Sequence, residues 1–480
     1  MLALVTLGVL PTIGFTQSSE DEEKSTYYTE PGTYGTKRES DPPNYVRNLS
    51  KTGISGTKNT NWLNVGLDYR IRYEHRHHDI RRTELTDDNP YLLRTRAYLG
   101  ITEKLDPFRA AIEFEDARRT NSQFAEDTRD FNRNELIQAY GELHFKKALG
   151  QDDLGNNRPV FVRYGRMAFE FLDRRLLALN QWRNTTNNFI GLRASFGQNA
   201  NPWALDLLAL NPIGRVTNAP DTTDTDRTVL AAIGHWRKWS EVVTIEPHFL
   251  VLNQRATPAT LNRARRINTL GLRLYGWVGK SGFNYDFTGL GQFGEDNQQR
   301  HIAQSFTGEV GYKMDHPWKP RISYFLGYAS GDKDPNDNQN NRFERFFGFA
   351  RPWSADDYIV MENVVARKLQ LEFEPIKSMR VDAGYSLYSL ASATDRFNNL
   401  LGGANNRDNT GSSGKKLGYS LDTRVRLKPT KFTDLTLGYS HFTNQEFVLA
   451  RQEAALGETA PGSTFFYIEF SANAFDLFKK

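Results

Sequence analysis

The sequence of 480 residues contains no cysteine and, beyond its first residues, no long apolar run. The lack of cysteine excludes disulfide bonds, cysteine nucleophiles and thiolate metal sites. No later stretch approaches the roughly 18 apolar residues that a membrane-spanning helix needs, so any membrane crossing would have to be made by strands. The chain also has no large excess of one charge, because it contains 61 Lys and Arg residues and 57 Asp and Glu residues. This near balance of positive and negative charge does not suggest a nucleic-acid partner.

Aliphatic residues are scarce, whereas aromatic residues are abundant. Hydrophobic residues make up 38% of the chain and aromatic residues 12%, and the mean hydropathy is −0.62. A soluble protein of this length would bury a larger aliphatic core. The aromatic content argues against a disordered chain. The composition therefore favours a folded protein without a large aliphatic core.

The N-terminal region differs from the rest of the chain. Residues 1–17 form a short apolar run followed by polar residues, which predicts a secretory signal peptide, although the run lacks a basic start and small residues at the cleavage site. Residues 18–61 are rich in Ser, Thr, Gly, Glu and Lys and show no periodicity. We expect them to form a flexible periplasmic leader or a small plug; a linker without a role is the alternative.

From Trp62 onward, apolar and polar residues alternate, which is typical of strands with one apolar and one polar face. In residues 63–74, Leu67 and its odd-numbered neighbours are apolar, whereas Asp68 and its even-numbered neighbours are mostly charged. Residues 417–428 repeat the pattern, with Leu417, Tyr419 and Leu421 on the apolar face. We count 18 such segments, centred near Leu67, Thr95, Ile112, Ala139, Val162, Leu192, Leu207, Ala232, Glu246, Leu272, Phe287, Gly308, Phe325, Leu369, Ala383, Thr423, Leu437 and Ile468.

The connections between these segments alternate between short and long nearly throughout. Short turns fall at residues 103–107, 197–201, 237–241, 279–282, 374–378 and 428–431, and long polar loops at 75–89, 117–132, 211–226, 253–266, 330–357, 391–415 and 443–462. This pattern predicts an all-β fold: a transmembrane, antiparallel up-and-down β-barrel of about 18 strands over residues 62–471, with a C-terminal tail at 472–480. An even strand number leaves both termini periplasmic. A soluble β-sandwich or a propeller is the alternative, but we find no repeat of fixed period.

Several local motifs add to this prediction. Arg163-Tyr164-Gly165-Arg166 ends a strand, and Asp173-Arg174-Arg175-Leu176, Asn180-Gln181-Trp182-Arg183-Asn184, Phe189-Ile190-Gly191-Leu192-Arg193 and Trp203-Ala204-Leu205-Asp206 follow it. In this order they resemble the alginate-export family of outer-membrane barrels, whose block runs roughly as GRQ, G-D-x-R-L, W-N and F-D-G-x-R. Met167 and Ile190 depart from that block, and the Gly before Asp173 is absent. The resemblance is strongest over residues 135–215 and implies an 18-stranded, porin-like barrel.

Alternation also assigns a set of side chains to the lumen. The predicted pore-lining residues are Arg70, Arg72, Arg94, Arg96, Arg109, Glu113, Glu115, Arg163, Arg193, Arg273, Arg380, Asp422, Arg424 and Arg426. Six of the arginines fall on one arc near the seam, and an arc of this kind would guide anions such as uronates or other acidic sugars. Alternatively, neighbouring acids such as Asp68, Glu74, Glu113 and Asp422 neutralise these arginines.

We find no catalytic constellation in the sequence. There is no nucleophile elbow, and Ser440 and His441 are adjacent, so on a strand they point to opposite faces. We therefore expect no enzyme activity, no cofactor and no resident metal. The sequence predicts a channel in the outer membrane of a Gram-negative bacterium that passes hydrophilic solutes by diffusion, with anionic saccharides as one candidate class. Dedicated export of an alginate-like acidic polysaccharide, or a non-conducting adhesion barrel, are the alternatives. Expected partners are membrane lipid, lipopolysaccharide and the outer-membrane assembly machinery.

Overall fold

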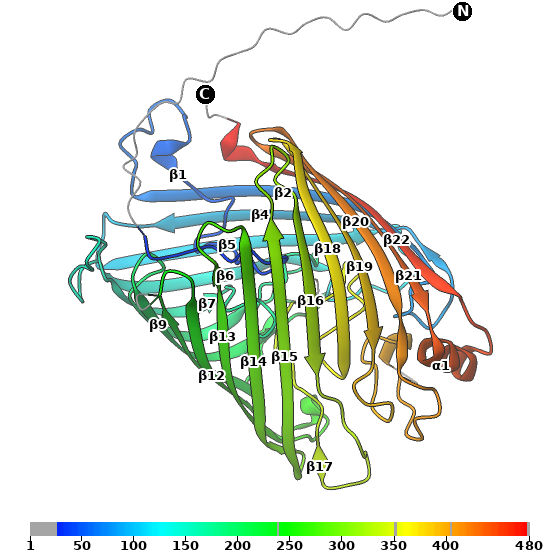
Figure 1. Ribbon diagram of the computed structural model, residues 1–480. Helices are drawn as coiled ribbons and strands as arrows, with labels where there is room; N and C mark the ends of the chain where they lie inside the picture. The colour runs from blue at the N-terminus through cyan, green and yellow to red at the C-terminus, as the bar shows by residue number, and fades with distance from the viewer. Residues whose placement is uncertain (1–25, 238–239, 350–352, 404–405, 478–480) are drawn as a thin grey trace, which may run out of the picture.

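A computed structural model describes residues 26–237, 240–349, 353–403 and 406–477. The predicted signal peptide, residues 1–17, lies outside the described residues. Eighteen long antiparallel strands form one closed barrel (Figure 1). Their bounds are β2 Leu63–His77, β4 Tyr91–Ile101, β5 Phe108–Thr120, β6 Asn132–Phe145, β7 Val160–Met167, β8 Phe189–Phe196, β9 Trp203–Gly214, β11 Arg227–Trp236, β12 Thr244–Gln254, β13 Arg265–Trp277, β14 Phe283–Asp296, β15 Gln299–Lys313, β16 Arg321–Ala329, β18 Val364–Ile376, β19 Met379–Ser389, β20 Lys416–Thr430, β21 Thr433–Asn444 and β22 Gly462–Asn473.

Each predicted segment centre falls inside one of these strands, so the strand count is confirmed. The barrel closes where β22 pairs with β2, with Phe470 opposite Ile71. The remaining elements are short: β1 Arg47–Asn48, β3 Asp87–Asp88, β10 Thr222–Thr223, β17 Gln339–Asn340, the helix α1 Glu446–Leu456, and the 3-10 turns η1 Leu49–Lys51, η2 Pro258–Thr260, η3 Leu401–Gly403 and η4 Ala474–Asp476. In the part of the chain that the structure describes, no helix is long and apolar enough to cross a membrane.

The two ends of the barrel differ. β1 and the end of β22 lie at one end, which we call the short-turn end, and α1 and β17 lie at the other, the long-loop end (Figure 1). Two connections break the predicted alternation: residues 146–159 make a long connection at the short-turn end, and Asn297 and Gln298 make a tight hairpin at the long-loop end. β22 also continues past the predicted barrel end at residue 471 to Asn473.

The alternation of faces is as predicted along most strands. Leu67, Leu272 and Leu421 are exposed on the outer surface, whereas Arg70 and Arg273 are buried on the inner side. Leu417 was predicted to face outward, and this is wrong: its side chain is fully buried among the loops. The register between β19 and β20 shifts next to Ser389, and this irregularity interrupts the alternation near the start of β20.

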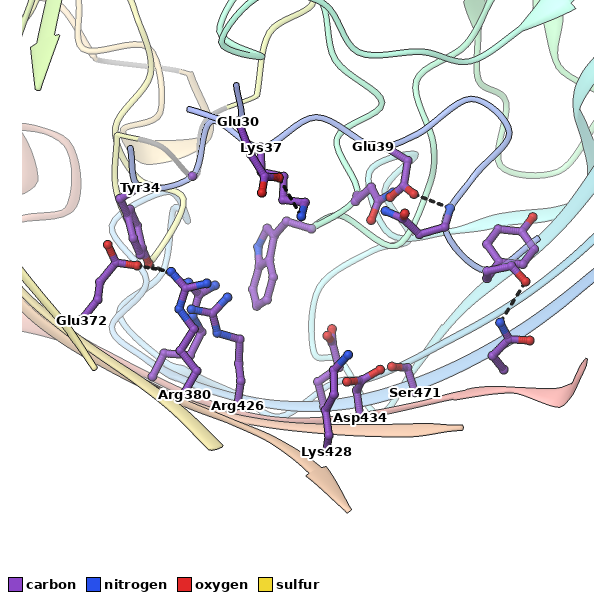
Figure 2. Close-up of a pocket in the computed structure, with 18 of the residues that line it drawn as sticks. Glu30, Tyr34, Lys37, Glu39, Glu372, Arg380, Arg426, Lys428, Asp434 and Ser471 are labelled. Atoms are coloured by element: carbon purple, nitrogen blue, oxygen red, sulfur yellow. Dashed lines mark hydrogen bonds and ion pairs between the residues drawn. The ribbon is translucent and has the colours of Figure 1, made fainter. Parts of the chain in front are cut away.

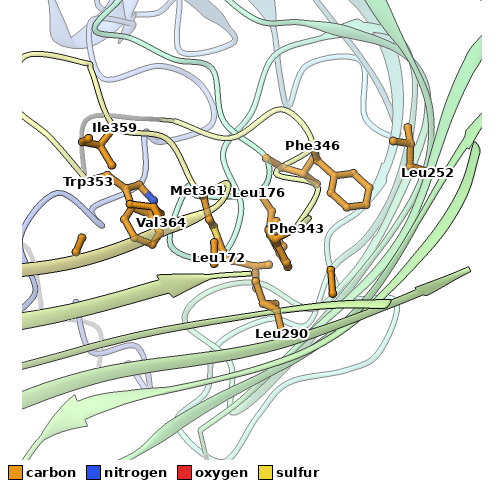
Figure 3. Close-up of a cluster of buried hydrophobic side chains, with 14 of the residues drawn as sticks. Leu172, Leu176, Leu252, Leu290, Phe343, Phe346, Trp353, Ile359, Met361 and Val364 are labelled. Atoms are coloured by element: carbon orange, nitrogen blue, oxygen red, sulfur yellow. The ribbon is translucent and has the colours of Figure 1, made fainter. Parts of the chain in front are cut away.

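Apolar side chains from the long loops fill the lumen at the long-loop end. Leu172 and Leu176 come from residues 168–188, whereas Phe343, Trp353 and Met361 come from residues 330–363 (Figure 3). They pack against inward-facing wall residues in one buried cluster. The composition had favoured a protein without a large core of this kind. Residues 168–188 form a further long loop that was not predicted, because they carry many apolar residues rather than the polar residues expected of a loop.

Candidate functional site

The loop of residues 168–188, which we call the inner loop, is held against the barrel wall by arginines of β2. Arg70 donates from Nη1 to the carbonyl of Gln181 (2.8 Å) and from Nη2 to the carbonyl of Arg183 (2.8 Å). Arg72 donates to the carbonyl of Trp182 (2.7 Å), and its guanidinium lies 3.7 Å from the centre of the indole ring. Two predicted pore-lining arginines therefore fix the backbone of a loop inside the lumen.

A second loop, residues 330–363, pairs with the inner loop. Leu177 and Phe347 form an isolated parallel bridge, and the amide of Ala178 donates to the carbonyl of Phe347 (3.2 Å). At Gly348 the two backbones approach so closely that an added Cβ would lie 1.7 Å from the carbonyl oxygen of Arg175. Only glycine fits at this position without moving the inner loop. The two loops thus form one packed unit across the lumen.

Burial shifts the ionisation of charged groups in the inner loop. It lowers the pKa of Arg183 to about 10, because the charged form loses its water shell. Burial also raises the pKa of Glu170, although Arg174, whose Nε lies 2.9 Å from the carboxylate, opposes this shift. Both shifts follow from the burial of these groups inside the barrel.

A cavity of about 810 Å³ remains near the short-turn end (Figure 2). More basic than acidic side chains line it. Its basic residues are Lys37, Arg47, Arg70, Arg94, Arg96, Arg174, Lys313, Lys319, Arg321, Arg380, Arg424, Arg426, Lys428 and Lys431, and its acidic residues are Glu30, Glu39, Asp68, Glu372, Glu374, Asp434, Glu469 and Asp476. Five of the six arginines of the predicted arc meet in this cavity. The sixth, Arg72, lies behind the inner loop beside Trp182.

All six arginines of the arc lie within 4 Å of a carboxylate oxygen, and Arg72 pairs with the predicted partner Glu74 (2.8 Å). Arg96 lies 3.2 Å from Asp68, and Arg424 and Arg426 lie 3.1 and 2.8 Å from Asp382. Asp68 was predicted to neutralise the arc, whereas the role of Asp382 was missed because pairing across neighbouring strands depends on register. Asp422 instead lies 3.5 Å from Lys368.

A second cavity of about 550 Å³ lies against β5 to β9. The predicted pore-lining residues Arg109, Glu113, Arg163 and Arg193 line it. Glu115 and Arg273 line neither of these two cavities. Glu115 accepts hydrogen bonds from the amide (2.9 Å) and hydroxyl (2.5 Å) of Thr186 in the inner loop, and Arg273 is fully buried between Glu246 (3.0 Å) and Asp286 (2.6 Å).

The segment of residues 30–47 crosses the lumen near the short-turn end; we call it the strap. Glu30 and Glu39 lie across the larger cavity from Arg426 and Lys428, whereas the side chain of Tyr34 points toward the arginines of this wall (Figure 2). The hydroxyl of Tyr34 donates to Asp382 of β19 (2.9 Å) and accepts from Arg424 of β20 (2.9 Å).

Further contacts tie the strap to other walls. Arg38 lies 3.5 Å from Glu246 of β12, and Tyr45 donates to Glu113 of β5. Burial would lower the pKa of Arg38, but Glu246 raises it above its ordinary value. Residues 37, 39 and 44 line both cavities, so the strap lies between them.

Ser440 and His441 point to opposite faces of β21, as predicted. The Ser440 hydroxyl donates to Asp356 (3.2 Å), whereas His441 Nδ1 lies 3.0 Å from the hydroxyl of Thr464. The two side chains therefore do not contact each other, and neither lines the cavities of about 810 and 550 Å³.

Comparison with known proteins agrees with this architecture. The alginate export family matches residues 61–460. Pseudomonas aeruginosa OccK2 (OpdF) is 11% identical, with a TM-score of 0.58 and coverage of 86% of this chain and 97% of that one. A BenF-like porin from Pseudomonas fluorescens is 9% identical, with a TM-score of 0.59 and coverage of 86% and 98%.

A structure of OccK2 in complex with glucuronate is 10% identical, with a TM-score of 0.56 and coverage of 85% and 98%. At such low identity these likenesses concern the fold. None of the curated proteins matches the chain. The match over most of its length, together with the closed 18-stranded barrel, shows that the chain belongs to the alginate export family and is an outer-membrane β-barrel with the porin fold.

Proposed function

We propose that this barrel is a channel that passes hydrophilic solutes by diffusion and prefers anionic ones, acidic saccharides among them. The observation that carries the proposal is the excess of basic over acidic side chains around the larger cavity. Rings of basic groups select anions in pores, and the guanidinium fork matches a carboxylate. The volume of about 810 Å³ lies in the range of sites for small organic ligands, which suits a monosaccharide or a short oligosaccharide.

Entry of solutes into proteoliposomes tests this function. We expect sodium glucuronate to enter faster than glucose, because the two sugars are similar in size and only glucuronate carries a negative charge. Liposomes without the protein set the background. Equal entry of both sugars would contradict the proposed preference for anions. Entry of neither sugar would contradict the proposal that the barrel is a channel.

Dedicated export of an acidic polysaccharide is the second candidate, and the family match favours it. A polymer chain would have to pass both the inner loop and the strap, which lie inside the lumen. Entry of long oligouronates at a rate close to that of glucuronate would favour the export channel. Exclusion of the long chains would favour the channel for small solutes.

We also propose that the short-turn end faces the periplasm, which places both termini there and the long loops outside the cell. The outer apolar face would then contact membrane lipid, and the long-loop end would meet lipopolysaccharide after insertion by the assembly machinery. An epitope inserted after Asn338, which is exposed in a long loop, should be labelled on intact cells. Labelling that occurs only in permeabilised cells would mean that the long-loop end, and not the short-turn end, faces the periplasm.

A further inference from the structure

Two arginines of the wall bind one carboxylate of the strap. Arg163 of β7 and Arg193 of β8 are direct neighbours in the register of the sheet. Both donate from Nη1 to Oδ2 of Asp41, over 2.8 and 3.1 Å. The strap thus supplies a carboxylate to a pair of converging guanidinium groups, an arrangement suited to binding carboxylates.

The wall, rather than Asp41, holds these arginines in place. Arg163 lies 3.9 Å from the ring centre of Tyr140 and 2.7 Å from the carboxylate of Glu142. Both guanidinium groups are largely buried.

Arg193 is held in a similar way. It lies 5.1 Å from the ring centre of Phe161 of β7 and 2.9 Å from the carboxylate of Asp206 of β9. The site is therefore built before Asp41 enters it, which reduces the ordering cost of binding any carboxylate there.

The charges around the two arginines allow Asp41 to leave and another carboxylate to take its place. Glu142 and Asp206 already balance the two arginines, so the departure of Asp41 leaves no unpaired buried charge. The side chain of Asp41 is 29% exposed and borders the smaller cavity, so a solute can approach it.

We propose that Arg163 and Arg193 form a carboxylate-binding site that Asp41 occupies in this conformation, and that a soluble carboxylate in the smaller cavity displaces Asp41 and loosens the strap. Asp41 acts as an internal competitor for the same two guanidinium groups. Only the nature of the solute rests on the proposed function. The exchange itself requires binding in the smaller cavity and no transport through the barrel.

The exchange can be tested by the accessibility of a buried residue of the strap. Thr36 is 1% exposed, and the protein has no cysteine, so T36C introduces a single thiol of nearly the same size. We expect a water-soluble maleimide to label purified T36C protein slowly. Sodium glucuronate should raise the labelling rate several-fold, and glucose should leave it unchanged.

A second substitution in the T36C variant tests which residues form the carboxylate-binding site. Asp41→Asn in the T36C background should raise the basal labelling rate several-fold and abolish the response to glucuronate. Arg193→Gln should also abolish the response. The matched control is Glu30→Gln, because Glu30 pairs at 2.7 Å with Lys37 of the strap itself rather than with the wall. It should behave like T36C alone.

Two outcomes would overturn the proposal. One is an unchanged labelling rate in the Asp41→Asn variant, and the other is an equal response to glucuronate with and without Asp41. Because the assay uses purified protein and no membrane, its result does not depend on whether the barrel conducts. A failure of the proposed function would appear separately in the proteoliposome assay.

Discussion

Arg70→Ala is expected to raise single-channel conductance several-fold by loosening the attachment of the inner loop to the wall. Arg70 makes two hydrogen bonds to the carbonyls of Gln181 and Arg183. Hydrogen bonds to a charged group contribute about 1.5–3 kcal/mol each, so the inner loop loses roughly 3–6 kcal/mol of local attachment. The hydrogen bond of Arg72 to Trp182 remains, and the pairing of β2 with β4 and β22 should keep the barrel itself folded.

Two further variants separate loss of attachment from loss of charge. Arg70→Lys keeps the charge but cannot span two carbonyls with a planar fork, so its conductance should lie between those of the wild type and Arg70→Ala. Arg380→Ala also removes one positive charge from the larger cavity, but Arg380 bonds to Glu372 and not to the inner loop. Its conductance should stay near that of the wild type. Equal conductance of the Arg70→Ala and Arg380→Ala variants would refute the claim that Arg70 holds the inner loop against the wall.

Replacing Arg380, Arg426 and Lys428 together by glutamine should produce the largest change in ion selectivity. All three line the larger cavity, and none bonds to the inner loop or the strap. Removing their charges leaves the nearby acids Glu372 and Asp382 less balanced. The reversal potential in a salt gradient should therefore move toward cation preference, and the shift should shrink at about 1 M salt, where the Debye length is about 3 Å.

The matched control removes three charges from the same end of the barrel but outside the larger and the smaller cavity described above. Lys146, Lys147 and Lys280 are exposed at the short-turn end and line neither cavity. Their replacement by glutamine should leave the reversal potential unchanged. An equal shift in both triple variants would mean that the overall charge of the mouth, and not the larger cavity, sets the selectivity.

The strands could be predicted from the sequence, whereas the contents of the lumen could not. Alternation is a local signal, and it placed Leu67 outside and Arg70 inside. It failed at Leu417, because a register shift between strands leaves no trace in the pattern of one strand. The partner of Arg424 and Arg426, Asp382, was missed for a related reason: pairing depends on how neighbouring strands align.

The sequence of the inner loop contains recognisable motifs, but they did not reveal that the segment is a loop. Asp173 and Asn180-Gln181-Trp182-Arg183-Asn184 were noted as family motifs, yet the segment was not assigned to a loop. Its apolar residues, such as Leu176, are buried only because a second loop, far away in sequence, packs on them. Likewise, Asp41 and Tyr45 lie in a polar stretch without periodicity, and only the closed barrel brings Arg163 and Glu113 within reach of them.

The most direct test of the central claim is the reversal potential of the unaltered protein in a planar bilayer under a salt gradient at low ionic strength. A basic cavity in the conducting path predicts an anion-selective potential that declines as salt rises, because mobile ions screen the fixed charges. A zero or cation-selective potential at low salt would contradict the claim. It would mean that Asp382, Glu469 and their neighbours neutralise the arginines completely, or that ions take a path that avoids the cavity.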